Sequence, residues 1–169
     1  MVKKAIRFFY NRLFASHKSE VEKARLGGVK IGENCHIYST YFDGIAPQLI
    51  TIGNNVTITH SSLLIHDAST KKQLGYTKAG AIIIGNDVFI GWNSIIIGPV
   101  RIGDKVIIGA GCVVTKDIPS NSVVVGNPCK IICSYDEYME KNKKKMNQNN
   151  TYLYPVDEMS KNTNLYYIL

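Results

Sequence analysis

The fold is decided by residues 84–118, which read, in groups of six, IGNDVF, IGWNSI, IIGPVR, IGDKVI, IGAGCV and VTKDI. The first position of every group is an aliphatic β-branched residue, glycine dominates the second, and the fifth is small or β-branched. The first positions are Ile84, Ile90, Ile96, Ile102, Ile108 and Val114. The fifth positions are Val88, Ser94, Val100, Val106, Cys112 and Ile118. Three patterns that share one period indicate a structural repeat.

A period of six excludes an α-helix and fits a strand. Six helical steps of about 100° would turn successive isoleucines by roughly 240°, so they would spiral around the axis. Six strand steps of about 180° return each isoleucine to the same face. Short strands that turn a corner every six residues wrap into a prism whose stacked coils bury an aliphatic core. The sequence therefore predicts a parallel β-solenoid.

The same pattern continues toward the N-terminus in two other registers, one with Ile31 and Ile37 and one with Ile52, Ile58 and Leu64. The spacing from one register to the next is not a multiple of six, so some residues must leave the regular coils. These extra residues predict a small excursion within residues 42–48 and a longer loop within residues 67–81. Loops that interrupt a regular scaffold are where binding and catalysis are usually placed.

Three regions follow from this pattern: an N-terminal segment over 1–28, the solenoid over 29–133, and a C-terminal helix and tail over 134–169. Residues 3–16 predict an amphipathic helix with Ile6, Phe9, Leu13 and Phe14 on one face. That helix would cap the first coil, pack on a partner subunit, or lie on a membrane surface, and we favour capping or packing. Residues 134–147 predict a charged helix.

Composition points to a folded protein without a membrane span. Of the 169 residues, 45% are hydrophobic and 20% are charged, and no apolar run approaches the roughly 18 residues that a span needs. The N-terminus lacks the apolar core of a signal peptide, so we expect a cytoplasmic protein. The four cysteines form no metal-binding pairs and are expected to be structural. The net charge of +7 is best explained by solvated helix faces.

Four segments within 29–133 resemble the hexapeptide-repeat acyltransferases, namely residues 84–93, 102–111, 114–119 and 126–130. The most similar branch contains the acetyl-CoA-dependent O-acetyltransferases of sugars, such as the maltose and galactoside acetyltransferases. The resemblance implies an all-β, left-handed parallel β-helix with short helical segments at its ends. It also implies a homotrimer with active sites between subunits, and acetyl-CoA as co-substrate.

The resemblance assigns the catalytic role to His66, which precedes the long loop and lies 23 residues before Phe89. A neutral hydroxyl is a weak nucleophile, and imidazole can take its proton and pass it to the departing thiolate. His60 and His36 lie within regular coils, and His17 belongs to the N-terminal region. Asp67, the next residue after His66, is assigned to substrate binding.

The resemblance places the coenzyme A groove along Ala110, Thr115 and Lys116, with Lys130 at the nucleotide end. Trp92 occupies a donor-contacting position that is often small in the family, so it would stack or narrow the channel. No metal is expected. Nucleic-acid binding is not expected either, because aromatic residues are not interleaved with basic ones in the repeat.

The leading hypothesis is acetyl transfer to a carbohydrate hydroxyl, in surface polysaccharide biosynthesis. Transfer to an antibiotic or another xenobiotic would use the same scaffold and donor residues. A γ-carbonic-anhydrase-like zinc enzyme would need converging histidines, and the spacing of His36, His60 and His66 does not match that arrangement. A non-catalytic scaffold that contacts the membrane through its N-terminal helix is the remaining alternative.

Overall fold

The computed structural model describes residues 18–146, and the helix expected over 3–16 lies outside this range. The chain divides into two compact units between Tyr135 and Asp136. No helix of the described part is long and apolar enough to cross a membrane. The region boundaries expected at residues 28 and 133 stay a prediction.

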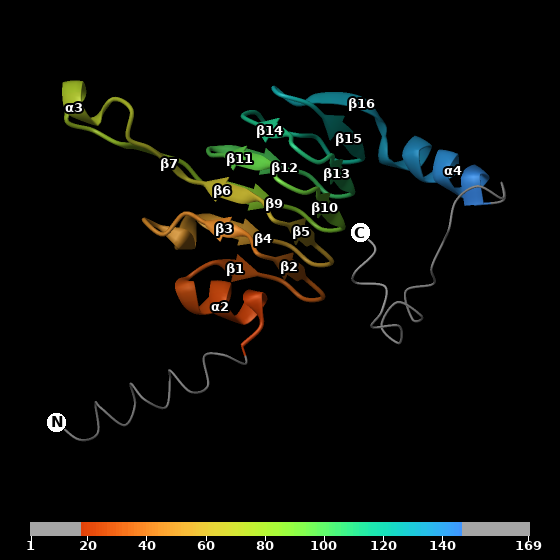
Figure 1. Cartoon of the computed structure of the whole chain (residues 1–169), viewed down its shortest axis with the longest axis horizontal. Coiled ribbons are helices and arrows are strands. Elements are labelled where there is room, and N and C mark those ends of the chain that lie inside the picture. The colour runs from red at the N-terminus through yellow and green to blue at the C-terminus, as the bar shows by residue number, and fades with distance from the viewer. Residues whose placement is uncertain (1–17, 147–169) are drawn as a thin grey trace, which may run out of the picture. The chain divides into compact units, whose positions relative to one another are not determined.

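Most strands between residues 18 and 135 form three sheets, one for each side of a coil (Figure 1). The first sheet contains β1 (Lys30–Ile31), β4 (Ile50–Ile52), β9 (Ile82–Ile84) and β12 (Val100–Ile102). The second contains β2 (His36–Tyr38), β5 (Thr57–Thr59), β10 (Val88–Ile90), β13 (Val106–Ile108), β15 (Ser122–Val125) and β16 (Lys130–Ser134). The third contains β3 (Tyr41–Phe42), β6 (Ser62–Leu64), β11 (Ile95–Ile97) and β14 (Val113–Val114). All their pairings are parallel except that of β15 with β16.

The core is a stack of aliphatic residues aligned from coil to coil. In the first sheet Ile52 pairs with Ile84 and Ile84 with Ile102. From Ile84 to Val114 every first-position residue is at most 2% exposed, which confirms the predicted inward face there. Burial of each such side chain contributes about 1.5–3 kcal/mol, so the repeat is the main source of stability. Leu64, expected on the same face as Ile58, is half-buried and points outward, and Leu63 is fully buried in its place, because only two residues join β5 to β6.

The glycine that follows each core isoleucine of the first sheet is required by close approach of neighbouring coils. A Cβ built on Gly85 would lie 2.5 Å from Asp104 Oδ1 and 2.8 Å from the Gly103 carbonyl carbon. Real side chains do not reach such distances, so a larger residue would push the coils apart. Glycine follows these isoleucines because neighbouring coils leave no room there for a side chain.

Amide and carboxylate side chains join the coils at the corner between the first and second sheets. Asn86 Oδ1 accepts from the Asn54 backbone N–H at 2.9 Å, and Asp104 Oδ1 accepts from both the Asn86 backbone N–H and its side-chain amide. The next residue in each of these turns has a positive φ, from 53° at Lys105 to 59° at Asn121. Asparagine and aspartate tolerate this left-handed conformation better than other residues with a side chain.

The remaining elements flank or interrupt the coils. The helix α2 (Glu20–Gly27) begins with a capping box between Ser19 and Glu22, which sequence reasoning missed, and buries Ala24 against the first coil. The small excursion contains η2 (Pro47–Leu49), and the long loop contains β7 (His66–Asp67), α3 (Lys71–Leu74) and β8 (Lys78–Ala79). The predicted charged helix is α4 (Tyr135–Met146).

Replacing Lys105 by asparagine should stabilise the protein. Lys105 is exposed and has a φ of 53°, whereas asparagine or aspartate fills the same turn position at Asn34, Asn55, Asp87 and Asn121. Relief of the left-handed strain is worth about 1 kcal/mol or less, which corresponds to a rise in Tm of about 1–4 °C. Lys105→Ala removes the same charge without easing the strain and is the control. Equal melting temperatures for the two variants would contradict this explanation.

Candidate active site

His66 lies at the corner where the second coil leaves the third sheet. It follows β6 and the fully buried Ile65, and it opens β7, which pairs with β8 through His66 and Ala79. The side chain of His66 is 28% exposed, so the imidazole can be reached from solvent. The long loop predicted after this histidine is present and begins at it.

Asp43 lies one coil below His66, and its carboxylate contacts the imidazole. Oδ2 meets His66 Nδ1 and also accepts backbone N–H bonds from Ile65 at 3.1 Å and His66 at 3.2 Å. Oδ1 accepts from the Ile45 backbone N–H at 3.2 Å. The residue is only 1% exposed. The carboxylate is therefore held from several directions by main chain and ring.

The electrostatics of this pair favour an ionised aspartate. Burial alone would raise the pKa of Asp43, but the hydrogen bonds from His66, Ile45 and Ile65 outweigh it, and the pKa lies below its ordinary value. An ionised carboxylate next to Nδ1 stabilises the tautomer that carries a proton there. The lone pair of Nε2 is then available to accept a proton. This is the arrangement of a general base and the group that orients it.

Sequence reasoning did not identify Asp43. The excursion over residues 42–48 was predicted, but no residue in it was given a role. The available signal was an acidic residue at the start of an excursion, about one coil before the candidate base.

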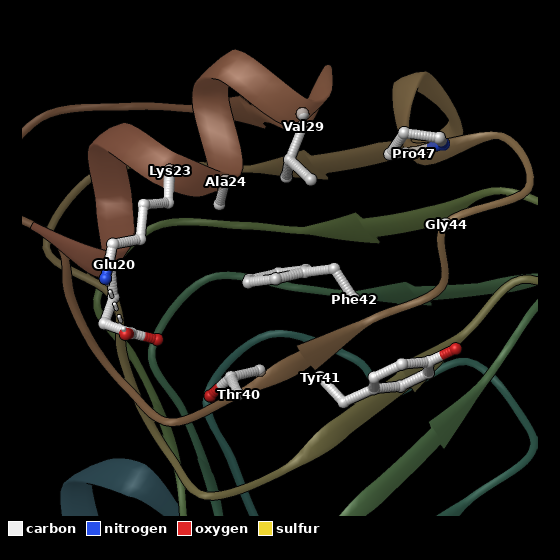
Figure 2. A pocket seen from close by; sticks show the side chains of 10 residues that line it. Glu20, Lys23, Ala24, Val29, Thr40, Tyr41, Phe42, Gly44 and Pro47 are labelled. Carbon is white, nitrogen blue, oxygen red and sulfur yellow. Dashed lines mark ion pairs between the residues drawn. The ribbon is translucent and has the colours of Figure 1, made fainter. Parts of the chain in front are cut away.

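A hollow of about 460 Å³ lies between α2 and β3, next to the segment that holds Asp43 (Figure 2). Phe42 and Gly44, the two neighbours of Asp43, both line it. Polar groups of Glu20, Lys23, Thr40 and Tyr41 lie at its border, and Glu20 pairs with Lys23 at 3.6 Å. One wall of this hollow is thus formed by the chain segment that contains Asp43.

Asp67 is engaged within its own loop. Its carboxylate accepts from the Ser69 backbone N–H at 2.8 Å and lies 3.7 Å from Lys78 Nζ. The hydrogen bonds from Ser69 and the charge of Lys78 lower the pKa of Asp67. The role given to Asp67 in substrate binding stays a prediction.

Two of the expected donor residues share the corner of His66. Ile97 of β11 pairs with Leu64 of β6. The register of β11 with β14 aligns Thr115, the residue after β14, with Ile97. Thr115 and Lys116 therefore leave the third sheet at the same end as His66, on a later coil. Both side chains are exposed.

The other three expected donor residues belong to a different corner, between the second and third sheets. Trp92 lies in the turn from β10 to β11, and the N–H of Gly111, next to Ala110, donates to the Trp92 carbonyl at 2.8 Å. Lys130 pairs with Val125 at the end of the second sheet. The three-residue strands of the third sheet separate this corner from that of His66 by roughly 10 Å. One chain thus presents the predicted residues in two groups.

Within residues 18–146 no three His, Cys, Asp or Glu side chains are grouped to hold a metal ion. The three histidines of the coils lie apart: His66 contacts Asp43, His60 stacks on Trp92, and His36 lies in β2. The described cysteines are all free thiols.

Acidification should reveal the depressed pKa of Asp43. A carboxyl group whose pKa is lower in the folded than in the unfolded protein stabilises the fold at pH values above its ordinary pKa, which is 3.8 for aspartate. That contribution is lost as the pH falls through the folded value. Between about pH 5 and pH 3 we expect the wild type to lose more unfolding free energy than Asp43→Asn, as measured by urea denaturation. Asp87→Asn, an exposed carboxylate in a distant turn, is the control, and parallel pH profiles for wild type and Asp43→Asn would contradict the assignment.

Known proteins resemble this chain in sequence and in structure. A family profile described as the hexapeptide repeat of succinyl-transferase matches residues 81–116. Protein CapG of Staphylococcus aureus is 40% identical over 154 residues, which cover 83% of this chain and 90% of CapG. The solved structure of a maltose O-acetyltransferase from Clostridium difficile is 30% identical, covers 73% of this chain and 81% of that one, and has a TM-score of 0.51.

A galactoside acetyltransferase solved in complex with coenzyme A is also 30% identical, with a TM-score of 0.55. The alignment covers 82% of this chain and 84% of that one. The predicted fold class, an all-β left-handed parallel β-helix, is confirmed by these relatives, and the predicted enzyme class agrees with them. Together with the repeat and the corner that holds His66, the comparisons establish that this chain belongs to the hexapeptide-repeat acetyltransferases.

Proposed function

We propose that the protein transfers an acetyl group from acetyl-CoA to a carbohydrate hydroxyl, with His66 as the general base. The observation that carries this proposal is the contact between the buried carboxylate of Asp43 and His66 Nδ1. A base that is held in one orientation by an ionised partner suits proton transfer from a weakly acidic hydroxyl. Relatives named for maltose and galactoside support a sugar acceptor.

The chemistry needs no covalent enzyme intermediate. Nε2 of His66 takes the proton as the hydroxyl oxygen attacks the thioester carbonyl. A tetrahedral oxyanion forms, the carbon–sulfur bond then breaks, and the proton passes from His66 to the departing thiolate. Asp43 touches neither substrate, so it is a positioning residue that holds the ring and stabilises its positive charge.

The donor would lie between the two corners. Lys116 and Lys130 offer cations for the phosphates of coenzyme A, and backbone groups near Ala110 and Thr115 can bond its pantetheine arm. The relative solved with coenzyme A supports this choice of co-substrate. Because these residues lie at two separate corners of a single chain, a complete groove would need a corner from a second copy.

A homotrimer with its active sites between subunits would meet this need. The outward side chains of the third sheet are largely apolar, and Leu64, Ile95, Ile97 and Val113 are only half-buried in the single chain. This face lies between the two corners, so covering it with a second copy would bring a His66 corner toward a Trp92 corner. Closed symmetric assemblies commonly arise in this way.

The acceptor side of the site would be formed by the excursion near Asp43 and the loop after His66. We place the reaction in surface polysaccharide biosynthesis, in the cytoplasm or at the inner face of the membrane.

The proposal is tested by following thiol release from acetyl-CoA in the presence of a panel of saccharides. His66→Ala should lower kcat by roughly 10²- to 10⁴-fold, the usual contribution of a general base. Asp43→Asn should cause a smaller loss, because the ring stays but its orientation and charge balance are weakened. His36→Ala, an exposed histidine on the second sheet, is the matched control. Wild-type protein that acetylates no saccharide, or a fully active His66→Ala, would reject the proposal.

Mixing two inactive variants tests whether the two corners come from different subunits. His66→Ala removes the base and Ala110→Phe fills the opposite corner, so each homotrimer should be inactive. Random mixed trimers made by co-expression should regain about a quarter of wild-type activity, since some interfaces then combine two intact corners. No recovery in mixed trimers of confirmed composition would show that the residues of one site come from a single chain.

A further inference from the structure

Trp92 and His60 form a stacked aromatic pair at the corner between the second and third sheets. The ring centroids are 3.7 Å apart and the ring planes are inclined by 25°. Trp92 nevertheless remains 55% exposed. One face of the indole is therefore covered by His60, and much of the rest is open to a ligand.

The pair results from unequal turns on neighbouring coils. Residues 60–61 join β5 to β6, whereas residues 91–94 join β10 to β11, so the longer turn reaches over the shorter one. Asn93 N–H donates to the His60 carbonyl at 3.2 Å, and Ser61 Oγ donates to the Gly91 carbonyl at 3.1 Å. These bonds tie the two turns together.

His60 occupies a position that limits which residues could replace it. Its φ of 42° is left-handed, a conformation in which histidine, asparagine and aspartate are enriched among non-glycine residues. Asparagine would satisfy this backbone equally well but would carry no ring. The conformation of the turn therefore does not by itself require the imidazole ring of His60.

The pair lies at one end of the strip formed by the three expected donor residues of this corner, Trp92, Ala110 and Lys130. Lys130 lies near its far end, Ala110 lies one coil above Trp92, and His60 lies directly below Trp92. A donor with its nucleotide at Lys130 and its arm along Ala110 would bring its acyl end to the indole. This orientation of the donor rests on the proposed function.

We propose that Trp92 is the end wall of the donor groove and limits the acyl group to acetyl, with His60 as the positioning residue that holds the indole in place. A free indole could rotate away from a longer chain. Stacking on His60, which is itself fixed by its turn, removes that freedom. An extra methylene that meets a rigid wall typically changes relative rates by 10- to 200-fold.

The first measurement uses binding and needs no turnover. Trp92 is the single tryptophan of the chain, so its emission reports directly on this corner. Acetyl-CoA should change the emission of the wild type, and calorimetry should give a tighter Kd for acetyl-CoA than for butyryl-CoA. His60→Asn and Trp92→Ala should bring the two Kd values to within about threefold of each other. Each variant loosens or removes the indole wall that would reject the added methylenes of butyryl-CoA.

The second measurement compares kcat/KM for acetyl-CoA and butyryl-CoA with one saccharide. Trp92→Ala should raise the butyryl-to-acetyl ratio by at least about tenfold, and His60→Asn by a smaller factor. His60→Phe, which restores a ring, should recover the wild-type ratio despite some backbone strain. His36→Asn is the matched control, because it makes the same exchange at another exposed position, in β2.

The outcomes separate this inference from the proposed function. Unchanged acyl selectivity in both His60→Asn and Trp92→Ala would overturn the inference while acetyl transfer still stands. A Trp92→Ala variant that raises the KM for the saccharide and leaves acyl selectivity intact would show that the indole contacts the acceptor, which also overturns it. If the wild type transfers no acyl group but its Kd values still depend on Trp92 and His60 as described, the inference stands and the proposed function fails.

Discussion

The close approach of successive coils at their corners is the constraint on which the rest of this structure depends. Coils that pack tightly enough to align Ile52, Ile84 and Ile102 leave no room for a side chain at Gly85. The same proximity lets Asp104 Oδ1 accept from the amides of Asn86 on the coil below. Apolar packing, glycine and the polar ladder are therefore three consequences of one spacing, which explains why they recur with one period.

A frame of this kind is stiff, and departures from it are confined to places where the chain leaves the register. The excursion after β3 begins with Asp43, and the long loop begins with His66. Continuing the pairing of Phe42 with Leu63 would place Asp43 beside Leu64, at an outward position. The excursion covers it instead, and three backbone N–H bonds together with the imidazole compensate its burial. The rigid coils thus hold His66 and Asp43 in a fixed relation.

The period made the scaffold predictable, and the breaks in the period located His66 and its loop. Asp43 escaped prediction because its burial depends on how the excursion folds, and no periodicity describes that segment. The separation of the expected donor residues has a geometric cause: Ala110 and Lys116 are six positions apart, which is one side of the prism. Trp92 and Ala110 differ by one full coil and so share a corner. The stacking of His60 on Trp92 arises from unequal turn lengths, which the repeat alone does not encode.

The two corners differ in how much they depend on assembly. The contact of Asp43 with His66 lies wholly within one chain, so the imidazole is oriented before any partner is present. The corner of the same chain that holds Ala110 and Trp92 lies across the third sheet from His66. A single subunit would therefore hold a prepared base without a complete groove, and binding energy for the donor would become available only in the oligomer. Since the face between the corners is apolar, the contact that buries it would also complete the site. Under the proposed function, stability of the assembly and catalytic competence would then depend on the same surface.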